Sequence, residues 1–263
     1  MRGFNLFLVF VFISSLVACK SDATDQSGDT QSEEQVEKKY TVTPFSRSAE
    51  FPDAQIESMT YQGGSFDFEI SGESYQLGVQ TPDAGQKMCA NSAKGQHIHL
   101  ILDRDPYSAQ YVSEFEYEVE DGTHNLLAFL SRSYHESIKT EGAHVAQRVQ
   151  VENGSIVSGE ELDGPTLFYS RPKGTYIGDD TKKIMVDFYP VNASIGDDYK
   201  IKLQVNGEVT LLDKWQPYYI ENLPMGDNTI GIALVYPDGT PVPGNQTAIL
   251  TRISLREDPL PSG

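Results

Sequence analysis

The chain has 263 residues, with 38 acidic and 20 basic side chains and a formal net charge of −18. This charge excludes electrostatic attraction to nucleic acid or to anionic lipid head groups, and the length allows one large domain or two of about 100 residues. The 14 Tyr and 12 Phe residues, together with the lack of long amphipathic helical periodicity after residue 18, favour an all-β protein.

The first 19 residues have the layout of an export signal. Arg2 supplies a positive n-region, and the apolar run 6–13 is too short to cross a bilayer as a helix of about 20 residues. The small and aliphatic residues directly before Cys19 resemble the lipobox of bacterial lipoproteins. That resemblance implies cleavage of a signal peptide over residues 1–18 and acylation of Cys19, whose acyl chains would anchor the protein durably in a membrane. The alternative is an ordinary signal peptide with an incidental cysteine.

Residues 20–39 are mostly polar, with six acidic side chains against three lysines and with Val36 as the one aliphatic side chain larger than alanine. Such a composition cannot bury enough apolar surface to fold. We therefore expect a disordered, acidic tether over residues 19–49, between the lipid anchor and the folded part. The protein is expected in the cell envelope, at the outer membrane, in the periplasm or facing the surface.

The folded part repeats with a period near 100 residues. Residues 96–102 correspond to 199–205 at a spacing of 103, and residues 119–130 correspond to 223–234 at a spacing of 104. About seven short strand-like runs per unit, separated by turn residues, are typical of immunoglobulin-like domains. The sequence thus predicts two tandem immunoglobulin-like β-sandwiches, expected over 50–152 and 164–256.

Strand alternation assigns side chains of the first unit to two faces. The expected strands of this unit are 66–70, 75–81, 96–103, 115–119, 123–131 and 144–151. Alternation points His97 and His99 outward on one strand and Leu127 and Phe129 outward on another, whereas the second unit has smaller residues at the positions equivalent to Leu127 and Phe129. This face is either covered by the second unit or by residues 40–55, or it is a ligand or partner surface.

All five histidines lie in the first unit, and most are expected at one end of it. In an immunoglobulin-like sandwich the start of 96–103, the end of 123–131 and the start of 144–151 meet at that end, beside the loop before residue 96. Imidazole, thiolate and thioether donors suit zinc or copper, and Met with Cys would favour Cu(I). The candidate metal ligands are His97, His99, His135, His144, Met88 and Cys89. The alternative is that these histidines have separate structural roles.

His124 is expected at the opposite end of the unit, where Asn228 replaces it in the repeat. We expect this side chain to be structural and bonded to backbone carbonyls.

Three successive motifs resemble those of an uncharacterised family of histidine-containing exported bacterial β domains. They are Gly-Gln-His-Ile-His-Leu-Ile-Leu-Asp at 95–103, Val-Glu-Asp-Gly-Thr-His-Asn-Leu at 119–126 and Leu-Ser-Arg-Ser-Tyr-His at 130–135. The chain has Ile98 where that family often has a further histidine, which weakens a metal site carried over from it. The whole chain also resembles two-domain lipoproteins of unassigned function from Bacteroidota. Neither resemblance implies a catalytic mechanism.

No arrangement of residues indicates an enzyme. Ser131 and His135 lie close in sequence, but the Gly-x-Ser-x-Gly elbow of serine hydrolases is absent. Asp103 and Asp105 lie in a proline-bounded turn, where carboxylates are typically solvated. We therefore expect a non-catalytic protein.

The function expected from these features is that of a binding or interaction module acting through the first sandwich. His97, His99 and His135 would make polar contacts and Leu127 and Phe129 apolar contacts with an envelope protein or a small polar ligand. One alternative is a periplasmic or surface protein that binds copper or zinc. The other is a structural spacer or assembly partner.

Overall fold

The computed structural model describes residues 40–257, which belong to one compact unit. Cys19, the signal peptide and residues 20–39 lie outside the described residues. The described part contains β-strands and three 3₁₀ turns, η1 (Ala84–Gln86), η2 (Glu141–Ala143) and η3 (Gly178–Thr181), and no α-helix. None of these turns approaches the length and apolar character needed to cross a bilayer. The predicted all-β fold is confirmed.

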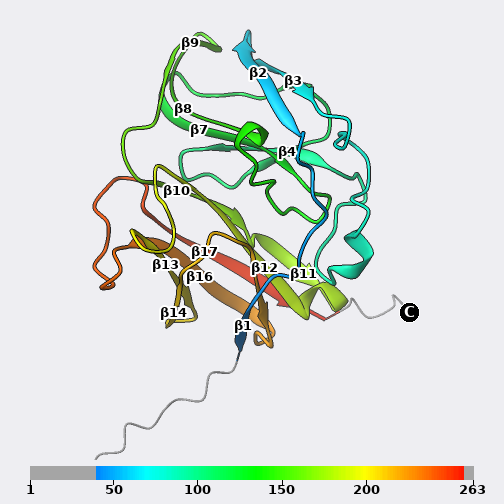
Figure 1. Ribbon diagram of the computed structural model, residues 1–263, viewed down its shortest axis with the longest axis vertical. Coiled ribbons are helices and arrows are strands. Elements are labelled where there is room, and N and C mark those ends of the chain that lie inside the picture. Colours follow the sequence, from blue (N-terminus) through cyan, green and yellow to red (C-terminus); the bar gives the residue numbers. More distant parts are fainter. Residues whose placement is uncertain (1–39, 258–263) are drawn as a thin grey trace, which may run out of the picture. The chain divides into compact units, whose positions relative to one another are not determined.

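The first sandwich has two antiparallel sheets, with strand orders β2-β3-β6 and β5-β4-β7-β8-β9 (upper part of Figure 1). Its strands are β2 (Gln55–Gln62), β3 (Ser65–Ser71), β4 (His97–Leu102), β5 (Ser108–Gln110), β6 (Glu114–Glu116), β7 (Gly122–Ser131), β8 (His144–Glu152) and β9 (Ser155–Glu160). The inward residues Ile98 and Leu100 of β4 and Leu126 and Leu130 of β7 pack between the sheets and are buried.

The second sandwich has sheets ordered β1-β15-β12-β10 and β11-β17-β16-β13-β14. Its strands are β1 (Thr41–Pro44), β10 (Thr166–Arg171), β11 (Gly174–Ile177), β12 (Lys183–Val191), β13 (Lys200–Val205), β14 (Glu208–Leu212), β15 (Tyr218–Glu221), β16 (Gly226–Val235) and β17 (Ala248–Arg256). Only β11 and β17 pair in parallel among the described strands. Ile201, Leu203, Ile230 and Ile232 contribute to the core of this sandwich.

The two sandwiches repeat the same strand pair in the same register. His97 of β4 lies opposite Ser131 of β7, and Lys200 of β13 lies opposite Val235 of β16. These are the positions that the spacings of 103 and 104 residues align. The immunoglobulin-like prediction is therefore confirmed at the strands that carry the repeat.

The predicted strand over 66–70 is confirmed as β3, but the next predicted strand is absent and β2 was not predicted. Residues 75–81, expected to be a strand, form turns, and β2 and β3 pair instead. A register shift between Ile56 and Ser58 breaks the alternation in β2, so its buried positions do not follow a period of two. Tyr75 donates hydrogen bonds to the backbone carbonyls of His97 and Ser131, at 3.1 and 3.0 Å, and therefore joins β4 and β7 without being part of a strand.

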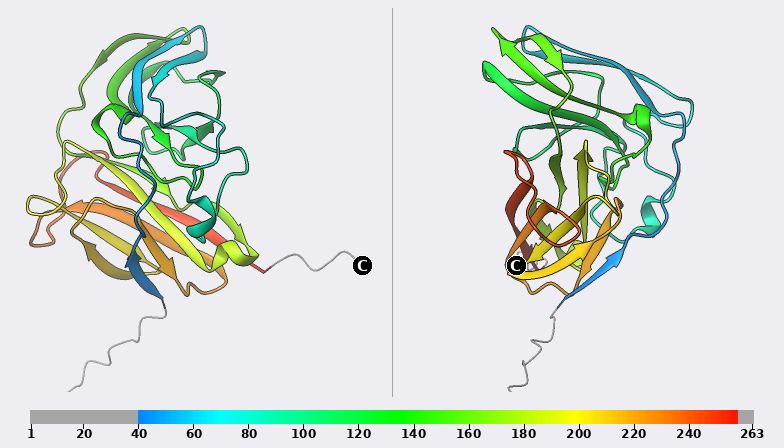
Figure 2. Two further views of the ribbon diagram at one scale, coloured as in Figure 1. Left: turned by 45° about the vertical axis from the view of Figure 1, so that its right-hand side comes forward. Right: turned by 60° about the vertical axis from the view of Figure 1, so that its left-hand side comes forward.

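The flexible tether expected over 19–49 does not extend to residue 49. Residues Thr41–Pro44 form β1, which pairs with β15 of the second sandwich, and Tyr40 is buried in the core of that sandwich. Figure 2 shows the blue segment running from β1 beside the second sandwich to β2 in the first. Three consecutive residues with β-branched side chains, 41–43, favour a strand, and the aromatic ring before them fills the core.

The outer face of the β4–β7 sheet is covered by the second sandwich. Leu127 and Phe129 are fully buried and pack with Phe168 and Tyr189, whose ring centroid lies 5.5 Å from that of Phe129. The prediction that Leu127 and Phe129 offer an apolar surface to a ligand or partner is therefore wrong. The bulky side chains on this face are explained by contact with β10 and β12.

Candidate metal centre

Three histidines of the first sandwich meet at its boundary with the second. His97 and His99 lie two residues apart on β4, and their rings project toward the same side of the sheet. His135 lies in the turn after β7, where its amide donates to the Arg132 carbonyl and its φ of 70° reverses the chain. Histidine is among the non-glycine residues that adopt this left-handed conformation more often than most. The turn brings its ring over the start of β4.

The ring nitrogens of these residues converge. His97 Nε2 lies 2.8 Å from His99 Nε2 and 3.0 Å from His135 Nδ1. One nitrogen from each ring lies within 4.8 Å of the other two, and the three side chains are buried. We refer to His97, His99 and His135 as the three-histidine site.

The ring nitrogens of His97 and His99 that point away from the other histidines have hydrogen-bond partners of their own. His97 Nδ1 lies 2.8 Å from the Gly95 carbonyl oxygen, which can only accept. Nδ1 therefore carries the proton, and Nε2 presents its lone pair to the other two rings. His99 Nδ1 lies 3.2 Å from the Ser170 hydroxyl, on β10 of the second sandwich. A histidine that binds a metal through one nitrogen usually has such a partner at the other.

The lone pair of His97 Nε2 faces two neighbouring nitrogens at once. If both His99 and His135 present N–H groups, two donors compete for one acceptor. If either presents a lone pair, two lone pairs face each other at 3.0 Å or less. A cation between the rings removes this conflict, because all three nitrogens can then donate their lone pairs to it.

Burial keeps these rings neutral. Burial is the main cause of a His97 pKa of about 4, and the positive charges of Arg171 and Lys173 contribute to the same lowering. Burial likewise holds the pKa values of His99 and His135 well below the ordinary value. Neutral imidazole is the form that binds metals, so the site needs to lose no proton from these rings at neutral pH.

The Tyr107 side chain closes the site from the β4–β5 connection. Its ring stacks on His99, with centroids 3.7 Å apart and planes 8° apart, and its hydroxyl oxygen lies 3.4 Å from His135 Nδ1. Burial raises the pKa of Tyr107, so the phenol remains protonated.

Two cations of the second sandwich lie beside this tyrosine. Arg171 is buried, donates from Nη1 to the Tyr176 hydroxyl at 3.0 Å, and has no partner for its Nε. Lys173 donates from Nζ to the Tyr107 carbonyl at 2.6 Å, and the same nitrogen lies 3.6 Å from the centroid of the Tyr107 ring. Burial lowers the pKa of Lys173 to about 8, with the charge of Arg171 as a second cause.

The other predicted ligands do not join the three histidines. Met88 is 66% exposed, and Cys89 packs with Tyr134 and Tyr219 in a separate cluster. Burial raises the pKa of the Cys89 thiol to about 12, which opposes thiolate formation. His144 packs against Tyr189, with ring centroids 5.0 Å apart. The structure therefore brings together three of the six predicted ligands.

His124 has the structural role predicted for it. Its Nε2 lies 2.9 Å from the Glu120 carbonyl and its Nδ1 lies 2.7 Å from Asp103 Oδ2. The Asn228 amide donates to the Pro224 carbonyl at 2.8 Å in the equivalent place of the second sandwich. Both side chains thus bond to the carbonyl four residues earlier.

Sequence reasoning missed Tyr107, Ser170, Arg171 and Lys173. Three of them come from the second sandwich, and a pattern within one strand does not show which side chains meet across a boundary between sandwiches. The only signal was the pair of basic residues on either side of Pro172 in an acidic chain.

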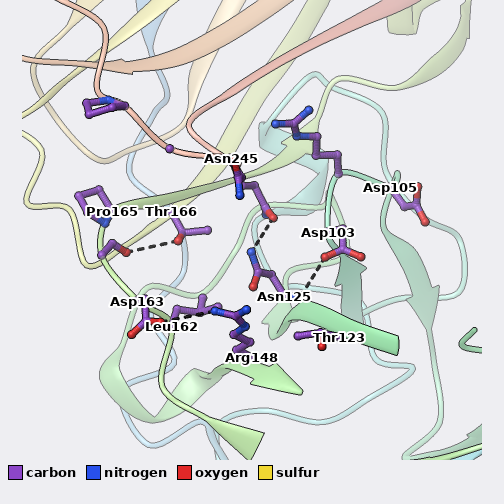
Figure 3. A pocket seen from close by; sticks show the side chains of 15 residues that line it. Asp103, Asp105, Thr123, Asn125, Arg148, Leu162, Asp163, Pro165, Thr166 and Asn245 are labelled. Carbon is purple, nitrogen blue, oxygen red and sulfur yellow. Dashed lines mark hydrogen bonds and ion pairs between the residues drawn. The ribbon is translucent and has the colours of Figure 1, made fainter. Parts of the chain in front are cut away.

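A second feature is a polar cleft of about 970 Å³, formed by loops of both sandwiches and by residues of β7, β8 and β10 (Figure 3). Asn125 Nδ2 donates to Gln246 Oε1 at 3.1 Å, which links the two sandwiches at the cleft, and Arg148 lies 3.5 Å from Asp163. The cleft contains none of the three histidines. Its lining residues are Asp103, Arg104, Asp105, Thr123, Asn125, Arg148, Leu162, Asp163, Gly164, Pro165, Thr166, Pro243, Gly244, Asn245 and Gln246.

No protein-family model matches this chain, and no curated protein matches it. Among solved structures, the fibronectin(III)-like modules of Clostridium thermocellum CbhA are 15% identical, cover 36% of this chain and 100% of their own, and align with a TM-score of 0.28. SGBP-B of the Bacteroides ovatus mixed-linkage glucan utilization locus, in complex with a mixed-linkage heptasaccharide, is 7% identical, covers 81% of this chain and 67% of its own, and has a TM-score of 0.20. Similarity at this level assigns no ligand to this chain.

Proposed function

We propose that this protein is an exported, lipid-anchored, non-catalytic binding module that holds one copper or zinc ion in the three-histidine site. The observation that carries the proposal is the convergence of three neutral imidazoles in which the tautomer of His97 directs a lone pair at the other two. A closed, buried site of this kind holds an ion and offers no open position for a substrate.

The close approach of the nitrogens is near what a shared ion requires. Ligand nitrogens at 2.0–2.1 Å from a zinc ion stand about 3.3 Å apart at a tetrahedral angle. His97 Nε2 lies 2.8 and 3.0 Å from its two neighbours, and the three nitrogens lie within 4.8 Å of one another, so movements of the rings that even out these distances would admit an ion. Gly95 and Ser170 would hold the ring orientations of His97 and His99 during this movement.

Metal uptake by the full chain, purified in detergent, tests this function. Elemental analysis after incubation with zinc, or with copper under reducing conditions, should give one ion per chain. His97→Ala, His99→Ala and His135→Ala should each lose it. His124→Ala removes an imidazole outside the site and serves as the matched control. Absence of stoichiometric uptake, or uptake unchanged in the three variants, would reject the proposal.

The lipid anchor is a separate part of the proposal and depends on Cys19, outside the described residues. Cells grown with a labelled fatty acid should incorporate the label into the protein, and Cys19→Ser should abolish the labelling and release the protein from the membrane fraction. Labelling that persists in Cys19→Ser would show that the acylated residue is a different one.

The polar cleft supports a second candidate function, the binding of a small polar ligand at the junction of the sandwiches. Its volume is at the upper end of the roughly 300–1,000 Å³ of small-molecule sites, and such sites often lie where domains meet. Equilibrium titration with neutral oligosaccharides, compared between the native chain and Asn245→Ala, tests it. If neither a metal nor such a ligand binds, the spacer alternative remains, and the burial of Leu127 and Phe129 is consistent with it.

A further inference from the structure

Two basic side chains beside the three-histidine site, Arg171 and Lys173, lie outside the ion pairs of their surroundings. The buried Asp187, opposite Arg171 on β12, pairs with Lys139 instead. None of the ion pairs among the described residues includes Arg171 or Lys173. Arg171 is buried and shares a small pocket with Cys89, Ala90, Tyr134, Tyr176 and Met185, none of which is an acid. Buried charges in proteins are usually paired, so the unpaired, buried Arg171 is unusual, and the half-buried Lys173 adds a second positive charge beside it.

Lys173 lies close to the histidines. The His99 ring stacks on Tyr107 at 3.7 Å and occupies one face of the phenol ring, so the Lys173 ammonium, 3.6 Å from the same centroid, lies over the other face. The ammonium is therefore roughly 7 Å from the His99 ring, with only the tyrosine between them. At this distance the charge acts on any ion held by the buried imidazoles.

The ligands themselves provide no negative charge. All three are neutral imidazoles, and the Tyr107 phenol, whose oxygen lies 3.4 Å from His135 Nδ1, remains protonated. Structural zinc sites usually complete four ligands, often with thiolates, and catalytic zinc sites keep a position for water. The buried site offers neither a thiolate nor open access, because Cys89 lies in a separate cluster.

Copper(I) suits these surroundings better than zinc(II). Both ions are d¹⁰ and impose no geometry through their d electrons, but copper(I) accepts low coordination numbers and carries half the charge. Its repulsion by two fixed cations is half that of zinc(II) at the same place, because Coulomb energy is proportional to the charge of the ion.

Resting on the proposed function, we propose that the three-histidine site selects copper(I) over zinc(II), and that Arg171 and Lys173 supply the selectivity through their charge. The imidazoles hold the ion, and the two cations discriminate between ions by valence. These two residues are positioning and selectivity residues that do not ligate the metal.

Competition with chelators of known affinity tests this on the full chain in detergent, without oxygen for copper(I). The native chain should hold copper(I) more tightly than zinc(II). In Arg171→Gln/Lys173→Gln both affinities should rise, by on the order of 10-fold for copper(I) and 100-fold for zinc(II). The zinc(II) increase is the square of the copper(I) increase because the repulsion energy that is removed is twice as large for the doubly charged ion. Lys173→Gln alone, at the less buried position, should raise both affinities by smaller factors. The logarithm of the increase should again be twice as large for zinc(II) as for copper(I).

Lys202→Gln is the matched control, because it removes the same charge from β13 in the other sheet of the second sandwich and should change neither affinity. Binding of neither ion would overturn the proposed function. Tighter binding of zinc than of copper(I), or an unchanged zinc-to-copper ratio in both Lys173→Gln and the double variant, would overturn the selectivity and leave metal binding in place.

Discussion

The rings of His99 and Tyr107 lie face to face, 3.7 Å apart and within 8° of parallel. His99 is on β4, and Tyr107 is in the connection to β5. The stack places one face of the phenol ring on the three-histidine site and the other face under Lys173. Tyr107 therefore connects Lys173 of the second sandwich with the histidines, beside the direct contact of Ser170 with His99, and its replacement tests how much the stacked ring stabilises the protein.

Tyr107→Ala should destabilise the protein by about 3–5 kcal/mol, because it removes a buried aromatic ring and leaves a cavity between the two sandwiches. Tyr107→Phe keeps the stack and should cost much less. Urea unfolding of the native chain and both variants measures the difference. Equal losses in the two variants would mean that the hydroxyl, and not the ring, provides the stabilisation.

The stability of the metal-free protein should depend on pH through His97. The folded pKa of about 4 lies below the ordinary value of 6.5, so between these values the unfolded chain binds a proton at this ring that the folded chain does not. The free energy of unfolding should therefore decrease as the pH falls from 6.5 to about 4, by roughly 3 kcal/mol from His97 alone. Urea unfolding in the presence of a chelator measures this, and His97→Gln should show a weaker dependence. A slope that is identical in both would contradict the assignment.

Phe129→Ala tests the contact between the sandwiches. The ring is fully buried and packs against Tyr189, so the substitution should cost about 3–5 kcal/mol. Leu250→Ala is the matched control: its side chain is 68% exposed, and the loss should stay within about 0.5 kcal/mol. A small loss at Phe129 would show that the sandwiches separate easily and that this face is accessible after all.

Tyr40→Ala tests whether the folded part begins before residue 50. Tyr40 is buried in the core of the second sandwich directly before β1, so its removal should lower stability by about 3 kcal/mol. Thr43→Ala, on β1 with a partly exposed side chain, should have a smaller effect. An unchanged unfolding temperature in Tyr40→Ala would mean that residue 40 is not part of the folded core and that the tether extends further, as the sequence predicted.

Much of the fold could be read from particular residues. The alternation of Ile98, Leu100 and Leu102, repeated in Ile201, Leu203 and Val205, predicts the central strands because one side of each must face a core. The role of His124 was likewise visible, since Asn228 occupies its place in the repeat and both bond to a backbone carbonyl. The bulge in β2 and the strand β1 were not visible, because a broken alternation and a strand beside a polar tail give no clear periodic signal.

The sequence by itself determined that this is a duplicated all-β protein and that His97 and His99 share one side of a strand, because side-chain alternation and the repeat are local properties. Only the tertiary structure decided that His135 joins them, that Met88, Cys89 and His144 do not, and that Leu127 and Phe129 are covered. These outcomes depend on a turn in the left-handed conformation and on the packing of β10 and β12 against β4 and β7. Contacts between segments far apart in the chain are fixed by how whole surfaces fit together, and no local pattern records that fit.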